Sequence, residues 1–149
     1  MLIGEYIHTI DEKNRISLPA KFRKEMGKKV IITPGLDNCL FVFTIAEWKK
    51  VSERLAGSGA DLSFLKADQR TFSRNMFGQA MDVDVDSIGR ILIPDYLKER
   101  VKLSGSAALI GVQDRVEVWN DKVWKETKAK AERQAEELEV QQEELRQSN

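Results

Sequence analysis

The sequence contains few of the residues that build disulfides, metal centres or catalytic sites. Among its 149 residues there is one cysteine, Cys39, and one histidine, His8. A single cysteine excludes an internal disulfide, and one cysteine with one histidine leaves too few ligands for a Cys/His metal site. Neither a glycine-rich phosphate loop nor a Ser/His/Asp arrangement in motif context is present. We therefore expect no enzyme activity, no cofactor and no bound metal.

Long apolar runs are also absent. No stretch approaches the ~18 consecutive apolar residues of a membrane span, and residues 1–5 lack the basic start of a signal peptide. Apolar residues still make up 42% of the chain, which is enough for a hydrophobic core. The formal net charge is zero, so the total charge gives no argument for a nucleic-acid partner. We expect a soluble, cytoplasmic protein that does not bind a membrane.

Proline is scarce as well, and two of the three prolines occupy equivalent places in an internal repeat. Residues 11–19 read DEKNRISLP and residues 86–94 read DSIGRILIP, so both contain Asp, three residues, Arg and a strand that ends in Pro. A shift of 75 positions aligns these two segments, and a shift of 76 then aligns the later parts of the two copies, as Trp48 with Trp124. A period this long does not fit a solenoid and indicates a duplicated half-domain.

Each copy predicts the same series of short elements. Asn14 and Gly89, which precede the two arginines, tolerate the positive φ of a tight hairpin turn. Pro19 suits the first turn of a helix, and Gly27 suits its end. In the first copy the predicted elements are a strand over 5–10, a turn over 11–15, a strand over 16–18, a helix over 20–26 and strands over 30–33 and 39–44.

Helical segments separate and follow the two copies. In the linker, apolar residues recur at helical spacing from Trp48 to Leu55, and Gly57-Ser58-Gly59 ends this helix before a second one. The tail contains no Gly or Pro and is rich in helix-forming residues. Its apolar residues recur every seventh position from Trp124 to Leu145, but the companion heptad positions are mostly polar. We therefore predict a solvated, charged helix, and a helix that docks on a neighbouring subunit is the alternative.

The neutral total conceals an uneven charge distribution. Residues 12–29 hold seven basic and two acidic residues, whereas residues 82–102 hold four basic and five acidic ones. A basic patch is the usual electrostatic mark of phosphate binding. We therefore predict a nucleic-acid-binding face on the first copy. The alternative is a short helix whose Lys and Arg side chains only face solvent.

The Asp-x-x-x-Arg turns can be interpreted in two ways. An arginine beside a tight hairpin turn can present its planar fork to a guanine or a phosphate. The aspartate four residues earlier can hold that arginine in place and accept hydrogen bonds from N–H groups of the turn. Alternatively, the pairs Asp11–Arg15 and Asp86–Arg90 are internal ion pairs that only stabilise the hairpins.

Three aspartates, Asp82, Asp84 and Asp86, alternate along one predicted strand. Carboxylates two residues apart share a face of the strand and could bind a divalent cation. We favour the simpler interpretation, in which the three side chains face solvent beside a basic partner surface.

These features together resemble the MraZ family of bacterial regulators, whose members carry two AbrB-like (SpoVT/AbrB) half-domains. The resemblance rests on the paired Asp-x-x-x-Arg turns, each followed by a strand, a proline and a helix, and it covers nearly the whole chain. Further segments close to the family's patterns are GEY at 4–6, HTID at 8–11, RISLPA at 15–20 and EVW at 117–119.

The resemblance implies a fold, an assembly and a function. The half-domains would interleave into a pseudo-symmetric small β-barrel with peripheral helices and a C-terminal helix, and the chains would assemble into homo-oligomeric rings. Members of the family regulate transcription by binding repeated elements in double-stranded DNA upstream of the cell-division and cell-wall gene cluster, so a nucleoid-associated protein is expected. The family's DNA-contacting motif falls on Asp11 and Arg15 and on Asp86 and Arg90.

We therefore predict an α+β chain with two AbrB-like repeats. Arg15 is expected to contact a base or a phosphate, with Asp11 orienting it, and the smaller number of basic neighbours around Arg90 predicts a lesser role there. The predicted DNA-binding residues are Asp11, Lys13, Asn14, Arg15, Lys21, Arg23, Lys24, Asp86 and Arg90. The predicted segments are the repeats at 5–48 and 81–124, a helical linker at 49–80 and a charged helical tail at 125–149.

Two other functions are compatible with the same sequence. AbrB-like folds also serve as antitoxins whose tail wraps a toxin partner, although a duplicated domain within one chain argues against this. A ring-forming scaffold that does not bind DNA would use the Asp–Arg pairs for structure alone.

Overall fold

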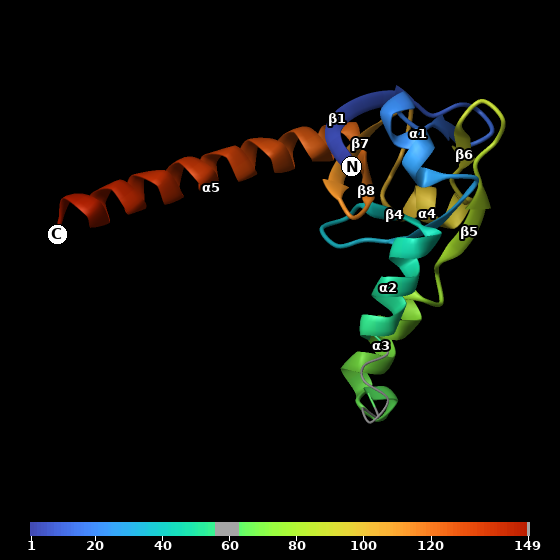
Figure 1. Ribbon diagram of the computed structural model, residues 1–149, viewed down its shortest axis with the longest axis horizontal. Coiled ribbons are helices and arrows are strands. Elements are labelled where there is room, and N and C mark those ends of the chain that lie inside the picture. The colour runs from blue at the N-terminus through green and yellow to red at the C-terminus, as the bar shows by residue number, and fades with distance from the viewer. Residues whose placement is uncertain (56–62, 149) are drawn as a thin grey trace.

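The computed structural model describes residues 1–55 and 63–148 (Figure 1). The predicted break at Gly57-Ser58-Gly59 lies outside these residues. The strands are β1 (Leu2–Thr9), β2 (Arg15–Ser17), β3 (Lys29–Pro34), β4 (Leu40–Thr44), β5 (Met81–Asp84), β6 (Arg90–Leu92), β7 (Ser106–Gln113) and β8 (Val116–Asn120). The helices are α1 (Ala20–Met26), α2 (Ile45–Leu55), α3 (Ala67–Met76), α4 (Asp95–Arg100) and α5 (Asp121–Gln147), with a short 3₁₀ helix, η1 (Ser63–Leu65). The predicted α+β class is confirmed.

Six strands form one antiparallel sheet in the order β1-β7-β8-β4-β3-β5, and β2 and β6 form a separate two-stranded ribbon. β1 pairs with β7 from Leu2 opposite Gln113 to Thr9 opposite Ser106, so the first strand of one copy lies beside a strand of the other. In the same way, β5 of the second copy pairs with β3 of the first. β4 and β8 join the two copies at the centre of the sheet.

The predicted small β-barrel is wrong, because the main sheet of the described chain is not closed. Within the described residues, the end strands β1 and β5 are not paired with each other, so the main sheet is open. The ribbon does not close it, because each ribbon strand is three residues long and Pro19 or Pro94 follows within two residues. Proline has no N–H with which to extend a ladder, and its fixed φ suits the start of a helix. α1 and α4 begin directly after these two prolines.

The central part of the sheet packs against other elements on both faces. Along β3, Val30 and Ile32 point to one face and Ile31 to the other, as strand geometry requires. The first face forms the main core with the ribbon, α1 and α4, through Ile16, Leu18, Phe22, Ile91, Ile93 and Leu97. The second face is covered by α2, α3 and the start of α5, through Trp48, Val51, Met76, Val123 and Trp124.

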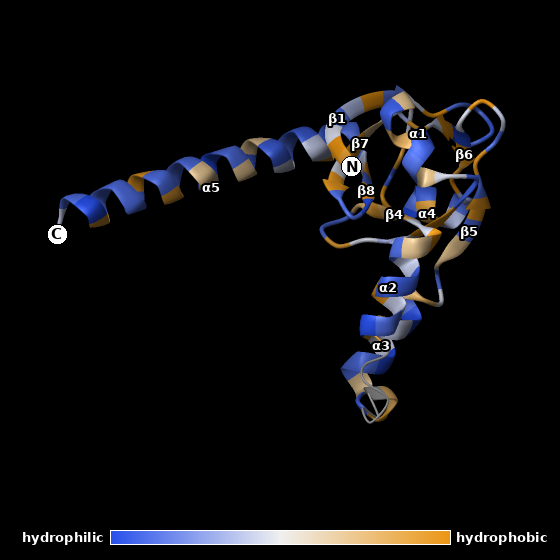
Figure 2. Ribbon diagram, in the orientation of Figure 1, coloured by the Kyte–Doolittle hydropathy of each residue, from blue (hydrophilic) through white to orange (hydrophobic). Residues whose placement is uncertain are grey.

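α5 leaves the sheet as a single long helix (Figure 1). It begins after Asn120, whose Oδ1 accepts hydrogen bonds from the N–H groups of Lys122 at 2.9 Å and Val123 at 3.2 Å. Near its start, Lys128 pairs with Glu5 of β1 at 3.0 Å. None of the described residues of α5 is buried, and Figure 2 shows mainly hydrophilic colours along it. No helix in the described part of the chain is both long enough and apolar enough to cross a membrane.

Candidate nucleic-acid interface

The first Asp-x-x-x-Arg turn is held together by the side chain of its aspartate. Asp11 Oδ1 accepts hydrogen bonds from the backbone N–H groups of Lys13 at 2.9 Å and Arg15 at 2.8 Å. Asp11 Oδ2 accepts from Arg15 Nε at 2.9 Å, which forms an ion pair. The Asn14 N–H closes the turn by donating to the Asp11 carbonyl at 3.0 Å, with Asn14 at a φ of 62°.

The second turn repeats this pattern atom for atom. Asp86 Oδ1 accepts from the N–H groups of Ile88 at 3.1 Å and Arg90 at 2.8 Å, and Oδ2 accepts from Arg90 Nε at 2.8 Å. The Gly89 N–H donates to the Asp86 carbonyl at 3.0 Å, with Gly89 at a φ of 83°. The two turns therefore present arginines in the same local geometry.

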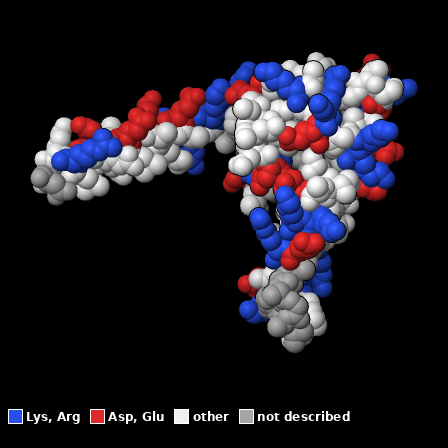
Figure 3. Space-filling model, viewed as in Figure 1, with Lys and Arg blue, Asp and Glu red and all other residues white. Residues whose placement is uncertain are grey.

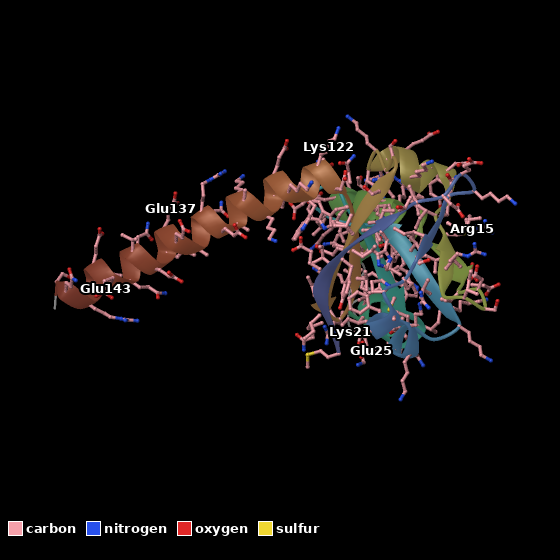
Figure 4. The ribbon with its side chains drawn as sticks, turned by 90° about the horizontal axis from the view of Figure 1, so that it is seen from above. Arg15, Lys21, Glu25, Lys122, Glu137 and Glu143 are labelled. Atoms are coloured by element: carbon pink, nitrogen blue, oxygen red, sulfur yellow. The ribbon has the colours of Figure 1, made fainter. Side chains whose placement is uncertain are left out.

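This geometry engages Nε of each arginine and leaves the end of its guanidinium for another partner. Because Nε is bonded to the aspartate, the two Nη groups form the end of the planar fork that a partner can approach. The Arg15 and Arg90 side chains are 30% and 28% exposed. In Figure 4, Arg15 lies at the rim of the globular part of the chain. Ion pairs this exposed contribute little to stability, but they orient a fork that can pair with a guanine or a phosphate.

The ribbon fixes where the two turns lie. In its register Arg15 is opposite Leu92 and Ser17 is opposite Arg90. The Ile93 N–H donates to the Asn14 carbonyl at 2.8 Å beyond one end of the ribbon. The two turns therefore lie at opposite ends of the ribbon, and its three-residue strands span about 10 Å.

The hydrogen bonds in the turns change the acidity of both aspartates. The Arg15 backbone N–H is the main cause that lowers the pKa of Asp11. Desolvation, the second largest effect, raises this pKa, and the Arg15 side chain and the Lys13 N–H lower it further. The Arg90 backbone N–H lowers the pKa of Asp86 in the same way. Both carboxylates are therefore ionised at neutral pH and can hold their arginines.

The lowered pKa values predict an acid-dependent loss of stability. A carboxylate with a lower pKa in the folded state stabilises the protein above its unfolded pKa, and this contribution is lost as the pH falls through the folded pKa. We expect Tm to fall less between about pH 6 and about pH 3 in the double variant D11N/D86N than in the wild type. Thermal unfolding followed by circular dichroism at several pH values measures this. The control is Glu12→Gln, and equal pH profiles for the wild type and the double variant would contradict the assignment.

The basic residues predicted to bind DNA lie in different parts of the structure. Lys13 lies in the first turn and is exposed. Lys21, Arg23 and Lys24 lie on α1, where Figure 3 shows basic side chains gathered on the surface. Figure 4 shows Lys21 well away from Arg15. The basic residues of the first copy therefore do not all surround the first turn.

Arg23 lies beside the second turn. Its Nε donates to the Leu18 carbonyl at 2.9 Å, and a Cβ added at Gly89 would clash with that Nε. A groove of about 550 Å³ is lined by Arg23 and Lys28 together with Asp86 and Gly89. The first copy thus supplies the second turn with basic neighbours that the second copy lacks in sequence.

Sequence reasoning missed two residues that contact the first turn. Lys98 Nζ donates to Asn14 Oδ1 at 2.8 Å, and Asn14 Nδ2 donates to Asp95 Oδ1. The shift of 75 positions places Lys98 opposite Arg23, and that correspondence was the available signal. This correspondence did not show that α1 would contact the second turn and α4 the first.

The other candidate sites do not form in the structure. Lys29 pairs with Asp82 at 3.5 Å and lies 3.9 Å from Asp84, while Asp86 is bonded within its own turn. In the described residues, no group of three or more His, Cys, Asp or Glu side chains could hold a metal ion. Burial raises the pKa of Cys39 to about 12, so this thiol remains protonated and unreactive.

Comparison with known proteins identifies similar sequences over both copies of the repeat. The matching family is described as "MraZ protein, putative antitoxin-like", and it matches residues 1–75 and 76–147. A relative from Caldanaerobacter subterraneus subsp. tengcongensis is 48% identical over 126 residues, which cover 85% of each chain. Another, from Caldicellulosiruptor saccharolyticus, is 42% identical over 145 residues, which cover 97% of this chain and 99% of the relative. Both relatives are named Transcriptional regulator MraZ, a name that denotes a regulator and not an enzyme.

Proposed function

The chain belongs to the MraZ family, and from this we propose that it is a sequence-specific transcriptional regulator that binds double-stranded DNA through its Asp-x-x-x-Arg turns. Its proposed targets are repeated elements upstream of the cell-division and cell-wall gene cluster. This function places the protein on the nucleoid, and it requires neither a cofactor nor a metal.

One observation carries the proposal. In both turns the aspartate bonds Nε of the arginine, at 2.9 Å and 2.8 Å, and leaves the Nη end of the guanidinium available to a partner. A guanidinium end of this kind can pair with guanine O6 and N7 in the major groove. An arginine that is already oriented also loses less conformational entropy when DNA binds. Arg15 and Arg90 are therefore the proposed base-reading residues.

The lysines have a different proposed role. Lys13, Lys21 and Lys24 are exposed and carry flexible ammonium groups. Contacts of such groups with phosphates fix the position of a protein on the duplex and carry no sequence information. Arg23, beside the second turn, is proposed to contact a phosphate there.

We further infer that the sequence repeats are the half-domains of a pseudo-symmetric unit. The strand order supports this, because exchanging β1, β3 and β4 with β5, β7 and β8 reverses the order β1-β7-β8-β4-β3-β5 onto itself. The proposed half-domains are residues 5–48 and 81–124, with a linker at 49–80 and a tail at 125–149. A homo-oligomeric ring of such units would engage tandem DNA elements by avidity, so that weak single contacts would suffice.

A titration against DNA tests the proposed function. We expect the protein to retard DNA from upstream of its own gene, with lower affinity for a shuffled sequence of equal length. If about 6–10 phosphates are contacted, affinity should fall by about 10³ or more between about 50 and 200 mM salt. Gel-shift titrations at these two salt concentrations measure both effects. Equal affinity for the upstream and shuffled DNA would contradict sequence-specific binding, and no retardation at low salt would contradict DNA binding itself.

Binding of a toxin is the second candidate function. It is favoured by α5, a helix of 27 residues with no buried residue, which offers a long surface to a partner. Purification of the full chain from its own host tests this alternative. A small protein that co-purifies in stoichiometric amounts, and is lost when residues 125–149 are deleted, would support it.

A further inference from the structure

The first turn is connected to a helix of the other copy by a bridge of three side chains. Asn14 lies in the turn, while Asp95 and Lys98 lie on α4, which are separations of 81 and 84 positions along the chain. We propose that Asp95 and Lys98 are positioning residues, which hold the first turn in its DNA-binding conformation by hydrogen bonding to the Asn14 carboxamide. The proposed effect on DNA rests on the function proposed above.

The chemistry of the bridge fits asparagine at this position. The carboxamide oxygen accepts from Lys98 Nζ at 2.8 Å, and the carboxamide nitrogen donates to Asp95 Oδ1. An aspartate in place of Asn14 would repel Asp95, and a glycine would bond to neither partner. Asparagine also tolerates the φ of 62° that the turn requires here. One residue therefore meets the backbone requirement and connects the turn to α4.

The second turn is built without such a bridge. Its equivalent residue is Gly89, which has no side chain, and Arg23 occupies the space where a Cβ would lie. Arg23 corresponds to Lys98 in the repeat, so the same helix position contacts the turn in both copies. In one copy it bonds to a side chain, and in the other it packs on the glycine and bonds to the Leu18 carbonyl at 2.9 Å. The two turns are therefore held in different ways.

The bridge adds side-chain contacts to an Asn14 backbone that donates to the Asp11 carbonyl at 3.0 Å and accepts from the Ile93 N–H at 2.8 Å. Asp11 holds the N–H groups of Lys13 and Arg15, whereas the Asn14 side chain has its partners on α4. Lys98 is partly buried, and Asn14 lies directly before Arg15. A fixed Asn14 fixes the path of the chain into Arg15. This preorganisation should increase the affinity for DNA without a new contact to it.

Two single variants and their combination test the bridge. Asn14→Gly removes the carboxamide and keeps the positive φ, as Gly89 does in the second turn. Lys98→Met removes the ammonium and keeps the aliphatic stem. We expect each to weaken operator binding roughly ten-fold, and the double variant to bind no more weakly than Asn14→Gly alone. Lys98→Arg, which keeps the positive charge, should retain most of the wild-type affinity. Lys125→Met on α5 is the matched control.

A measurement without DNA separates the bridge from the proposed function. Amide hydrogen exchange of the turn, residues 11–15, should be faster in Asn14→Gly and in Lys98→Met than in the wild type. Unchanged exchange in both variants would overturn the bridge, whether or not the protein binds DNA. Additive losses of affinity, with a salt slope lowered by about 1 in Lys98→Met, would also overturn it, because Lys98 would then contact a phosphate directly. Wild-type protein that binds no DNA would overturn the proposed function and leave the exchange result to decide on the bridge.

Discussion

Arg15→Ala is expected to weaken binding to the specific DNA by about 1–3 kcal/mol for each subunit engaged, and to reduce the preference over shuffled DNA. The reason is the geometry of the turn, in which Asp11 bonds Arg15 Nε at 2.9 Å and leaves the Nη end to read a base. In an oligomer that binds tandem elements, these losses accumulate over the engaged subunits. Gel-shift titration at physiological salt measures the effect.

Two variants separate base reading from simple charge attraction. Arg15→Lys keeps the charge but loses the planar fork, so we expect it to restore little of the sequence preference. Lys21→Ala, away from the first turn in Figure 4, should weaken binding to all sequences alike and lower the salt slope by about 1. If Arg15→Ala bound the specific DNA as the wild type does, Arg15 would be only part of an internal ion pair. Arg90→Ala provides the same comparison for the second turn.

Phe22→Ala is expected to lower the free energy of unfolding by about 3–5 kcal/mol, the largest loss of stability predicted for a single substitution here. Phe22 on α1 is fully buried in the main core. Its ring stands edge-on to Tyr6 of β1, with ring centres 5.3 Å apart at an angle of 85°. The substitution removes this contact and leaves a cavity between α1 and the sheet. Urea unfolding followed by tryptophan fluorescence measures the loss.

Phe72→Ala is the matched control, since it makes the same chemical change on α3. The Phe72 side chain is 37% exposed and can be replaced by water where alanine leaves space. We expect a loss of about 1 kcal/mol or less. Similar losses for both variants would show that the core around Phe22 relaxes more than its burial indicates.

The local elements followed from the sequence because short-range rules determine them. The positive φ expected at Asn14 and Gly89 is present, and so is the bonding of each Asp to its Arg. The strand predicted over 39–44 is present as β4, and its neighbouring residues Leu40 and Phe41 contribute to opposite cores. Each of these features depends on residues within a few positions of one another.

The arrangement of the copies could not be predicted in the same way. The pairing of β1 with β7 and of β3 with β5 joins segments far apart in the chain. Whether such a sheet closes depends on strand lengths and edges, which a resemblance to a family does not specify. Counting charges along the chain also assigned Arg23 to a basic face of the first copy, whereas the fold places it beside Gly89 in the second turn. For the same reason the Asn14–Lys98 contact was not foreseen.

The pairing of strands from one copy with strands from the other determines how the chain can be divided. Cutting the gene at the boundary between the two matched regions, after residue 75, would leave β2 without β6, β1 without β7 and β5 without β3. Neither fragment alone would retain a complete sheet, but the two expressed together could reassemble by complementation. The strand pairing thus makes each part of the chain depend on the other for a complete sheet, so that neither can be treated as an independent folding unit.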